Sequence, residues 1–285
     1  MTLLAFQQVK NLIQVAIEED LGRGDVTTEA TIAEHVVSRA RLMAKQEIVL
    51  AGMEVFTGVY RILDDSIQID ASRKDGDLVP VGAVIAELNG RARPLLMGER
   101  VALNFLQRLS GIATLTRRYV EAVKGYKADI VDTRKTTPGW RVLEKYAVRA
   151  GGGKNHRHDL GDGVLIKDNH IVAAGGIKPA IEMARTHSHH LLKIEVEVET
   201  LEQLEEALQA RADVIMLDNM SPAMLATAVK MIAGRAIVEA SGGVSLETVV
   251  EIACTGVDLI SVGKLTHSAP GADIHIEFDV PQYSS

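Results

Sequence analysis

The chain has 285 residues, of which 47% are hydrophobic and 24% charged, and these ordinary proportions exclude an intrinsically disordered protein. No apolar run reaches the roughly 18 residues that a membrane-spanning helix needs. The single cysteine, Cys254, excludes a disulfide framework within one chain, and its apolar surroundings predict a small buried hydrophobic residue. Such cysteine usage makes a cytoplasmic location the default expectation.

The net charge of −7 argues against bulk nucleic-acid binding, but this charge is unevenly distributed. From Arg134 to Lys167 there are eight lysines and arginines against three acids, so this segment carries +5 and the rest of the chain −12. A basic segment in an acidic protein indicates a binding site for a small polyanionic ligand. The alternative is a basic face that only contacts solvent.

The first part of the chain, residues 1–108, has the pattern of a small α+β domain. Apolar residues at helical spacing predict an amphipathic helix over 1–18, and a glycine-rich turn follows over 19–28. The remaining predicted elements are strands over 36–44, 47–51, 66–71 and 83–89, a helix over 52–63, a turn over 74–82, and a long helix over 94–124.

The second part alternates strands with helices. Apolar, β-branched runs predict strands over 129–132, 163–167, 193–198, 213–217, 236–240 and 257–262. Helical patterns separate them over 138–149, 177–187, 200–211, 221–233 and 245–254. Strands joined by helical crossovers run parallel in a sheet covered by helices.

These patterns predict an α/β protein with two domains and a tail. The predicted domains are an N-terminal α/β sandwich-like domain over 1–108 and an α/β barrel over 109–270, and the tail, 271–285, packs back on the first domain. A complete eight-unit barrel needs about 250 residues, so the second domain is predicted to be an incomplete barrel of six or seven strands. An open, doubly wound parallel sheet is the alternative.

Polar or glycine residues lie at or just after the C-terminal end of every predicted parallel strand, where the reactive groups of α/β folds collect. In strand order they are Thr133, Arg134 and Lys135, then Lys167, Glu197, Asp218, Ser241 to Gly243, and Gly263. Chance would not readily place such residues after all six strands. The sequence therefore predicts a functional site at one rim of the sheet.

The residue types at this rim indicate anionic ligands. Arginine offers paired donors to carboxylate or phosphate, and lysine offers a point charge. The acids Glu197 and Asp218 either bind sugar hydroxyls or hold a Mg²⁺ ion that bridges phosphates. The glycine loops open ahead of helices, where backbone N–H groups can approach a phosphate.

Ten stretches of the chain resemble the quinolinate phosphoribosyltransferase family, in the family's order and over nearly the whole chain. They are EDLGRGDVTT (19–28), ERVALN (99–104), LSGIAT (109–114), DTRKTTP (132–138), KYAVRAGGGKNHR (145–157), GVLIKDNHI (163–171), EVEV (195–198), LDN (217–219), SGG (241–243) and SVG (261–263). The resemblance implies an enzyme of de novo NAD biosynthesis. Its reaction would transfer phosphoribosyl from phosphoribosyl diphosphate to quinolinate with decarboxylation, giving nicotinate mononucleotide, pyrophosphate and CO₂.

The resemblance also implies roles for single residues. Arg100 would be donated across a homodimer interface, with a hexamer as a further assembly. The dicarboxylate pocket would consist of Thr133, Arg134, Lys135, His156, Arg157 and Lys167. Glu197 and Asp218 would bind the phosphoribosyl group, and phosphate would be received by Ser241, Gly242, Gly243 and Gly263, followed by Lys264 and Leu265. The catalytic candidates are Lys135, Lys167, Glu197 and Asp218. Mg²⁺ is expected with phosphoribosyl diphosphate, with Glu197 and Asp218 as its candidate ligands, and no organic cofactor is expected.

Two positions depart from the family pattern, and three different functions stay open. Asp159 stands where members often have glycine, and Lys264 where they often have alanine; we expect both to tune the site. Lys167 could instead be the Schiff-base nucleophile of an aldolase or lyase. The chain could also be a non-catalytic module that binds sugar phosphates, or a family relative with a different acceptor.

Overall fold

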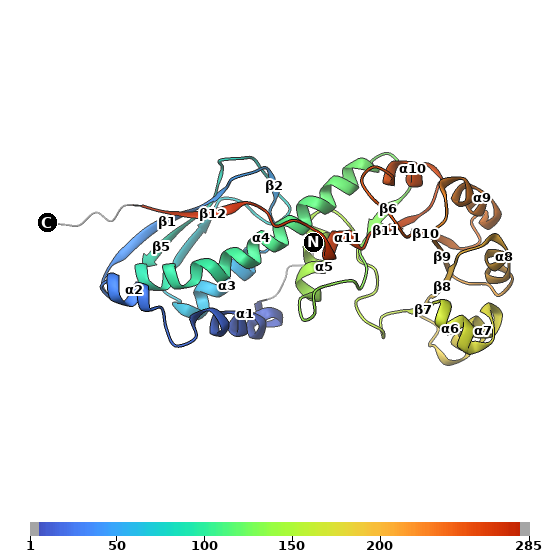
Figure 1. Cartoon of the computed structure of the whole chain (residues 1–285), viewed down its shortest axis with the longest axis horizontal. Coiled ribbons are helices and arrows are strands. Elements are labelled where there is room, and N and C mark those ends of the chain that lie inside the picture. The colour runs from blue at the N-terminus through green and yellow to red at the C-terminus, as the bar shows by residue number, and fades with distance from the viewer. Residues whose placement is uncertain (1–5, 280–285) are drawn as a thin grey trace. The chain divides into compact units, whose positions relative to one another are not determined.

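The computed structural model describes residues 6–279 (Figure 1). These residues form two compact units that are not continuous in sequence. The first unit contains the chain up to Arg117, residues 137–152 and the chain from Ser268 onward, and the second contains residues 118–136 and 153–267. The first five residues of the predicted N-terminal helix and residues 280–285 of the predicted tail lie outside the described residues.

The first unit contains a four-stranded antiparallel sheet of strand order β12-β1-β5-β3. Its strands are β1 (Val37–Ala44), β3 (Gln68–Ala71), β5 (Val84–Arg91) and β12 (Ile274–Phe278). Burial alternates along β1, so that Ala40, Leu42 and Ala44 face the core while Arg41 and Met43 between them are more exposed. A second antiparallel pair joins β2 (Ile48–Val49) to β4 (Leu78–Val79), which lies within the predicted turn 74–82.

Helices lie along one side of this sheet (Figure 1). They are α1 (Phe6–Leu21), α2 (Val26–Thr31), α3 (Met53–Leu63) and the first part of α4 (Ala92–Ala122), and the first unit also contains α5 (Arg141–Ala150). The predicted turn over 19–28 is wrong at both ends, because α1 continues to Leu21 and α2 already begins at Val26. Asp25 explains the early start, since its side chain accepts a hydrogen bond from the backbone N–H of Thr28 at 2.9 Å and so caps the helix.

The second unit contains a parallel six-stranded sheet, so the predicted parallel sheet is confirmed. Its strands are β6 (Asp129–Val131), β7 (Val164–Ile166), β8 (Ile194–Val198), β9 (Val214–Asp218), β10 (Ile237–Ser241) and β11 (Leu259–Ser261). Its helices are α6 (Asp168–Ala174), α7 (Ile177–His187), α8 (Leu201–Gln209), α9 (Pro222–Ile232), α10 (Val249–Cys254) and α11 (Lys264–His267). Neither α6 nor α11 was predicted, because both are too short to show a helical period.

The strand order distinguishes the barrel from the doubly wound sheet. From β7 to β11 each strand pairs with the next in the chain, and β6, the first strand, pairs with β11, the last. A barrel has this circular order, whereas a doubly wound sheet reverses its order at a switch point. Within the six-stranded sheet β6 and β7 are the two ends of the order, so the incomplete barrel is confirmed and its interruption lies between them.

A segment after α5 extends the β6 edge of this interruption. Lys154 forms a parallel bridge with Val131, and its backbone N–H donates to the carbonyl of Ile130 at 2.8 Å. Backbone groups at an exposed sheet edge need such partners. The segment that begins here carries His156 and Arg157, two of the predicted site residues.

Cys254 is exposed, so the prediction of a buried cysteine is wrong. It is the last residue of α10, whose buried residues are Val249, Ile252 and Ala253. The apolar stretch around Cys254 belongs to a helix with one buried face, and the cysteine lies off that face. Within residues 6–279, no helix is long and apolar enough to cross a membrane.

Candidate active site

The ends of the parallel strands surround two cavities in the second unit. The first cavity has a volume of about 320 Å³ and is lined by Thr133, Arg134, Lys135, His156, Arg157, Leu165, Lys167, Met216, Glu239, Ser241 and Ser261. The second has a volume of about 290 Å³ and is lined by Thr133, Lys135, Asp218, Asn219, Ser241, Gly242, Gly243, Val244, Ser261, Val262, Gly263, Lys264 and His267. Thr133, Lys135, Ser241 and Ser261 line both, so the cavities adjoin.

The loop after β6 brings the predicted Thr-Arg-Lys triplet to the first cavity. The hydroxyl of Thr133 accepts a hydrogen bond from the backbone N–H of Lys135 at 3.0 Å. The fully buried Thr266 donates its hydroxyl proton to the carbonyl of Lys135 at 2.8 Å. These bonds fix the loop backbone, while the side chain of Lys135 stays exposed and free to reach either cavity.

Asp132, at the end of β6, holds the segment that carries His156 and Arg157. Its fully buried carboxylate accepts hydrogen bonds from the backbone N–H of His156 at 2.8 Å and from Asn155 Nδ2 at 2.6 Å. Arg157 Nη1 donates to the carbonyl of Gly163 at 2.9 Å. A buried acid that receives two donors anchors the segment against the end of the strand.

The first cavity is electropositive. Burial and the neighbouring Arg134 guanidinium lower the pKa of Arg157, and Glu195 acts in the opposite direction. A cation that is destabilised by another cation is stabilised when an anion enters between them. The cavity is therefore suited to a ligand that brings its own negative charge.

Lys167 and Glu197 form an ion pair, in which Lys167 Nζ donates to Glu197 Oε2. They come from the ends of neighbouring strands, since Lys167 follows β7 and Glu197 lies in β8. Lys167 lines the first cavity, and Glu197 reaches it through this contact without lining either cavity itself. The side chain predicted to bind a dicarboxylate is thus joined to the side chain predicted to bind ribose.

Asp218 and the glycine loop form one wall of the second cavity. Asn219 Nδ2 donates to Asp218 Oδ2 at 2.7 Å, and the backbone N–H of Asn219 donates to the carbonyl of Ser241 at 2.9 Å. Asn219 has a left-handed backbone, with φ of 53°. Gly242 has φ of 91°, and a Cβ there would lie only 2.1 Å from Asn219 Oδ1. Only glycine therefore fits beside Asn219 without displacing it.

Of the remaining predicted residues, some line the second cavity and others lie outside both cavities. Gly263 and the exposed Lys264 line the second cavity, whereas Leu265 is fully buried in α11 and lines neither cavity. Asp159 is exposed and accepts the backbone N–H of Gly161 at 2.8 Å in a loop outside both cavities. Arg100 is exposed on α4, in the first unit.

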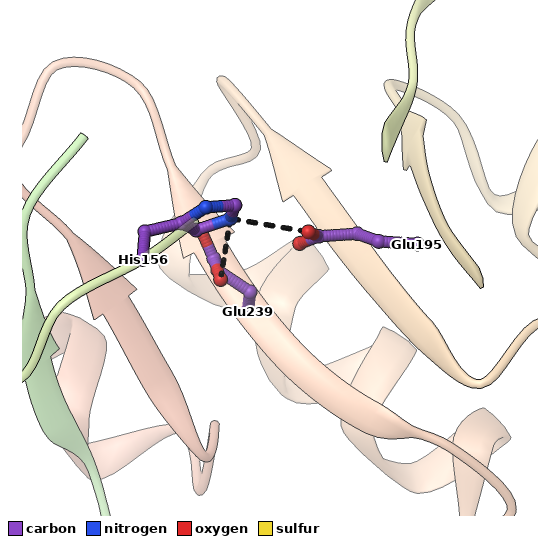
Figure 2. A group of neighbouring side chains, drawn as sticks. All are labelled: His156, Glu195 and Glu239. Atoms are coloured by element: carbon purple, nitrogen blue, oxygen red, sulfur yellow. Dashed lines mark hydrogen bonds and ion pairs between the residues drawn. The ribbon is translucent and has the colours of Figure 1, made fainter. Parts of the chain in front are cut away.

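Sequence reasoning missed Glu239, which lines the first cavity from β10. Figure 2 shows the imidazole of His156 facing both Glu239 and Glu195, with Nε2 at 3.8 Å from Glu239 Oε2 and 3.1 Å from Glu195 Oε2. Burial, and then the charge of Glu195, raise the pKa of Glu239 to about 8. A lone acid within an apolar strand was the signal that could have revealed it.

Comparisons with known proteins match most of the chain to a single family. Residues 25–110 match the family model described as "Quinolinate phosphoribosyl transferase, N-terminal domain", and residues 112–277 match the corresponding C-terminal domain. The chain is 48% identical over 270 residues to the "Probable nicotinate-nucleotide pyrophosphorylase [carboxylating]" of Bacillus subtilis, covering 95% of this chain and 93% of that protein.

Other relatives come from a plant and from a second bacterium. The chain is 43% identical to "Quinolinate phosphoribosyltransferase [decarboxylating] 1b" of Nicotiana tabacum, covering 95% of this chain and 82% of that protein. It superimposes on the solved structure of the nicotinate-nucleotide pyrophosphorylase from Francisella tularensis with a TM-score of 0.94 at 40% identity, covering 97% of this chain and 98% of that one. The similarity to these relatives, in sequence and in fold, therefore extends over both units of the chain.

Proposed function

The chain belongs to the quinolinate phosphoribosyltransferase family, and we propose on that premise that its two cavities bind the two substrates of one transfer reaction. The enzyme moves phosphoribosyl from phosphoribosyl diphosphate to quinolinate with decarboxylation. The products are nicotinate mononucleotide, pyrophosphate and CO₂, and the reaction belongs to de novo NAD biosynthesis. The chain is thus a decarboxylating pyridine phosphoribosyltransferase.

The cationic lining of the first cavity is the observation that carries the assignment of quinolinate. Four basic side chains, Arg134, Lys135, Arg157 and Lys167, surround a volume of about 320 Å³. Quinolinate is a planar dianion with adjacent carboxylates, and guanidinium groups bind carboxylates with paired donors. We assign its two carboxylates to these four cations, with Thr133 and His156 beside them.

The second cavity fits the phosphoribosyl group. The loop from Ser241 to Gly243 and Gly263 present backbone to the cavity without side chains in the way, which suits a phosphate. The carboxylates of Glu197 and Asp218 suit ribose hydroxyls, which donate hydrogen bonds. Because Thr133 and Lys135 line both cavities, the ring nitrogen and the sugar carbon C1′ would meet at the boundary.

We propose that Mg²⁺ enters as part of the phosphoribosyl diphosphate substrate, where it would neutralise pyrophosphate charge. As direct metal ligands the two candidate acids fit poorly. Lys167 already neutralises Glu197, and Asn219 donates to one oxygen of Asp218. A second cation at Glu197 would compete with the lysine ammonium, so we assign these acids to ribose rather than to metal.

The chain's own residues would act mainly by orientation and electrostatics. The cations neutralise quinolinate and align its ring nitrogen with C1′, whose bond to pyrophosphate breaks as the nitrogen attacks. The ring becomes a pyridinium. The bond from C2 to the carboxylate then breaks, and its electron pair stays on C2 beside the positive nitrogen. Since the pyridinium itself stabilises this carbanion, we propose that no organic cofactor is needed.

The Schiff-base alternative is disfavoured by the partner of Lys167. A nucleophilic lysine must be a neutral amine, and a buried or cationic environment usually provides this. Here Lys167 Nζ is instead paired with the carboxylate of Glu197, whose side chain is largely buried. A charged Lys167 is suited to binding an anion.

The assembly and location belong to the same proposal. We propose a homodimer, or a hexamer, in which the exposed Arg100 of one copy enters the site of the next. The single cysteine supports a cytoplasmic location. Sedimentation of the protein, and the activity of mixtures of Arg100→Ala with Arg134→Ala, test the assembly. If Arg100 acts across an interface, mixtures that form mixed dimers are more active than either variant alone.

The function is tested by incubating purified protein with quinolinate, phosphoribosyl diphosphate and Mg²⁺, and following nicotinate mononucleotide by chromatography. Nicotinate is the parallel acceptor. We expect product from quinolinate alone, with one CO₂ for each product molecule. The absence of product from either acceptor, in protein that still binds phosphoribosyl diphosphate, would indicate a relative with a different acceptor.

A further inference from the structure

Two acids and one imidazole form a largely buried cluster (Figure 2), and two of its members, His156 and Glu239, line the first cavity. Glu195 comes from β8, Glu239 from β10, and His156 from the segment after α5. Their facing oxygen and nitrogen atoms all lie within 4.8 Å of one another. Glu239 is 1% exposed, and one oxygen of each glutamate, Oε1, is buried without a hydrogen-bond partner within the described residues.

The interior of a barrel is ordinarily filled by branched apolar side chains. Two carboxylates there cost free energy unless protons or cations compensate them. The reaction of this site, by contrast, consumes a proton within the cavity, because the carbanion at C2 must be protonated after CO₂ leaves. The cluster therefore lies where a stored proton would be used.

The hydrogen bonds of His156 show what the cluster can hold. The backbone N–H of Arg157 donates to His156 Nδ1 at 2.7 Å, so Nδ1 must carry a lone pair. The proton of the neutral ring is then on Nε2, which faces Glu195 and Glu239. A metal ion would need the lone pair of Nε2, so this arrangement favours a proton between the acids over a divalent cation.

One proton donor serves two carboxylates in this arrangement. The Nε2 proton of His156 satisfies Glu195, at 3.1 Å, and leaves Glu239 with the longer distance of 3.8 Å. The facing oxygens of Glu195 and Glu239 lie within 4.8 Å of each other, so a proton on one of them removes the repulsion between two buried charges. Glu239 is the more buried of the two.

We propose that Glu239, in its protonated form, is the catalytic acid that delivers the proton to C2 of the pyridine ring after decarboxylation. This inference rests on the proposed function. The O–H bond of Glu239 breaks as the electron pair left by CO₂ forms the new C2–H bond. Glu239 becomes a carboxylate, which the Nε2–H of His156 can then stabilise, and the proton is restored from water after product leaves.

The groups around Glu239 determine how this step depends on pH. Glu195 and His156 face it, and its strand neighbours β9 and β11 contribute the uncharged Met216 and Ser261. The four basic side chains Arg134, Lys135, Arg157 and Lys167 line the same cavity. With the pKa of Glu239 raised to about 8, its proton is present below that pH and lost above it, so kcat falls on the alkaline side.

The test is the Glu239→Gln variant, which keeps the shape of the side chain but has no acidic proton. We expect kcat to fall roughly 100-fold or more, the usual contribution of a general acid, and the alkaline limb near pH 8 to disappear. KM for both substrates should stay within about twofold, because no binding cation changes. Glu199→Gln, at an exposed position just after β8, is the matched control and should behave as wild type.

Several outcomes would overturn the assignment. An unchanged kcat and pH profile in Glu239→Gln would mean that Lys135, Lys167 or water supplies the proton. A rise in KM with kcat unchanged would mean that Glu239 only supports binding. One tightly bound divalent cation per wild-type chain, absent from Glu239→Gln, would show that the cluster is a metal site.

A second measurement keeps the inference testable if Glu239→Gln does not fold. Infrared spectra of the wild-type protein should contain the carbonyl band of a buried, protonated carboxyl group that disappears as the pH rises through about 8. The lack of such a band would contradict the inference. This spectrum needs no substrate, so it separates failure of the proton assignment from failure of the proposed function, which the absence of nicotinate mononucleotide would show.

Discussion

The two adjoining cavities recognise anions by different means. The first presents charges at the ends of long basic side chains, and among them the exposed Lys135 can turn toward a ligand. The second presents glycine backbone at positions such as Gly242, packed against Asn219. Flexible charges tolerate small changes in a ligand, whereas close backbone approach tolerates none. The comparison implies that substitutions in the second cavity should cost more than the loss of one charge in the first.

The largest effect is expected from Gly242→Ala. The new Cβ would lie 2.1 Å from Asn219 Oδ1, at a φ of 91° that alanine rarely adopts. Such strain costs on the order of 1–3 kcal/mol, and it displaces the residue that orients Asp218. Because this strain adds to the lost support of Asp218, we expect affinity for phosphoribosyl diphosphate to fall by more than roughly 100-fold, with quinolinate binding little changed, as measured by calorimetry.

A matched control separates strain from the clash. Gly234→Ala has a similar backbone, with φ of 77°, but a Cβ at this position would meet nothing within 4 Å, and Gly234 lines neither cavity. It should lower the Tm without changing either affinity. Equal losses of affinity in the two variants would show that backbone strain alone, and not contact with Asn219, is responsible.

Arg134→Ala should produce the next largest effect, in the other cavity. Losing one hydrogen-bonded charge costs about 1.5–3 kcal/mol, or roughly 10- to 100-fold in quinolinate affinity. Binding of phosphoribosyl diphosphate should change much less, and calorimetry with each substrate measures both. Lys178→Ala, on the exposed face of α7, is the control for loss of a positive charge. Equal weakening of both substrates would contradict the division of roles between the cavities.

Asn219→Gly should have a smaller effect. Glycine adopts the left-handed φ of 53° without cost, so this change removes only the amide that donates to Asp218 at 2.7 Å. A hydrogen bond to a charged group contributes about 1.5–3 kcal/mol at most, and water can replace part of it at an exposed position. We expect KM for phosphoribosyl diphosphate to rise several-fold while KM for quinolinate is unchanged. A greater rise in the KM for quinolinate would contradict the assignment of Asp218 to the phosphoribosyl group.

The smallest effects are expected at the two positions that depart from the family pattern. Asp159→Gly changes an exposed loop outside both cavities and should alter kcat and KM by less than about twofold. Lys264→Ala removes an exposed charge from the second cavity, so affinity for phosphoribosyl diphosphate should fall modestly at low salt and hardly at high salt. A large effect of Asp159→Gly on either substrate would show that its loop moves into the site.

Much of the barrel could be predicted because its signals are local. The apolar runs at β8, β9 and β10 are short and are separated by helical patterns. The sequence therefore predicted both that these segments are strands and where they lie. The pairing of β6 with β11 could not be read from periodicity, because it joins strands far apart in the chain. Likewise α6 has only seven residues and buries none of them, so no buried apolar stripe could reveal it in the sequence.

The candidate site likewise contains residues that the sequence could reveal and residues that only the three-dimensional structure reveals. Lys167 and Asp218 could be found because they end strands, and strand ends meet at one rim. Glu239 could not be placed, because its role depends on His156 and Glu195, which arrive from other elements. The support given by Asp132 to the segment with His156 is also a three-dimensional property, visible only once β6 and that segment lie together.

The pairing of β6 with β11 also has a consequence for how the protein is made. Val131 pairs with Ser261, and in the first unit Leu42 pairs with Ile276, so each sheet includes a strand from the C-terminal part of the chain. Closing such long loops is slow, because their entropy is lost before the contacts form. During synthesis β6 and β1 therefore keep one edge unpaired until the ribosome has released the residues of β11 and β12 that pair with them. Both cavities are lined by Ser261, so the growing chain has no complete binding site before that strand arrives.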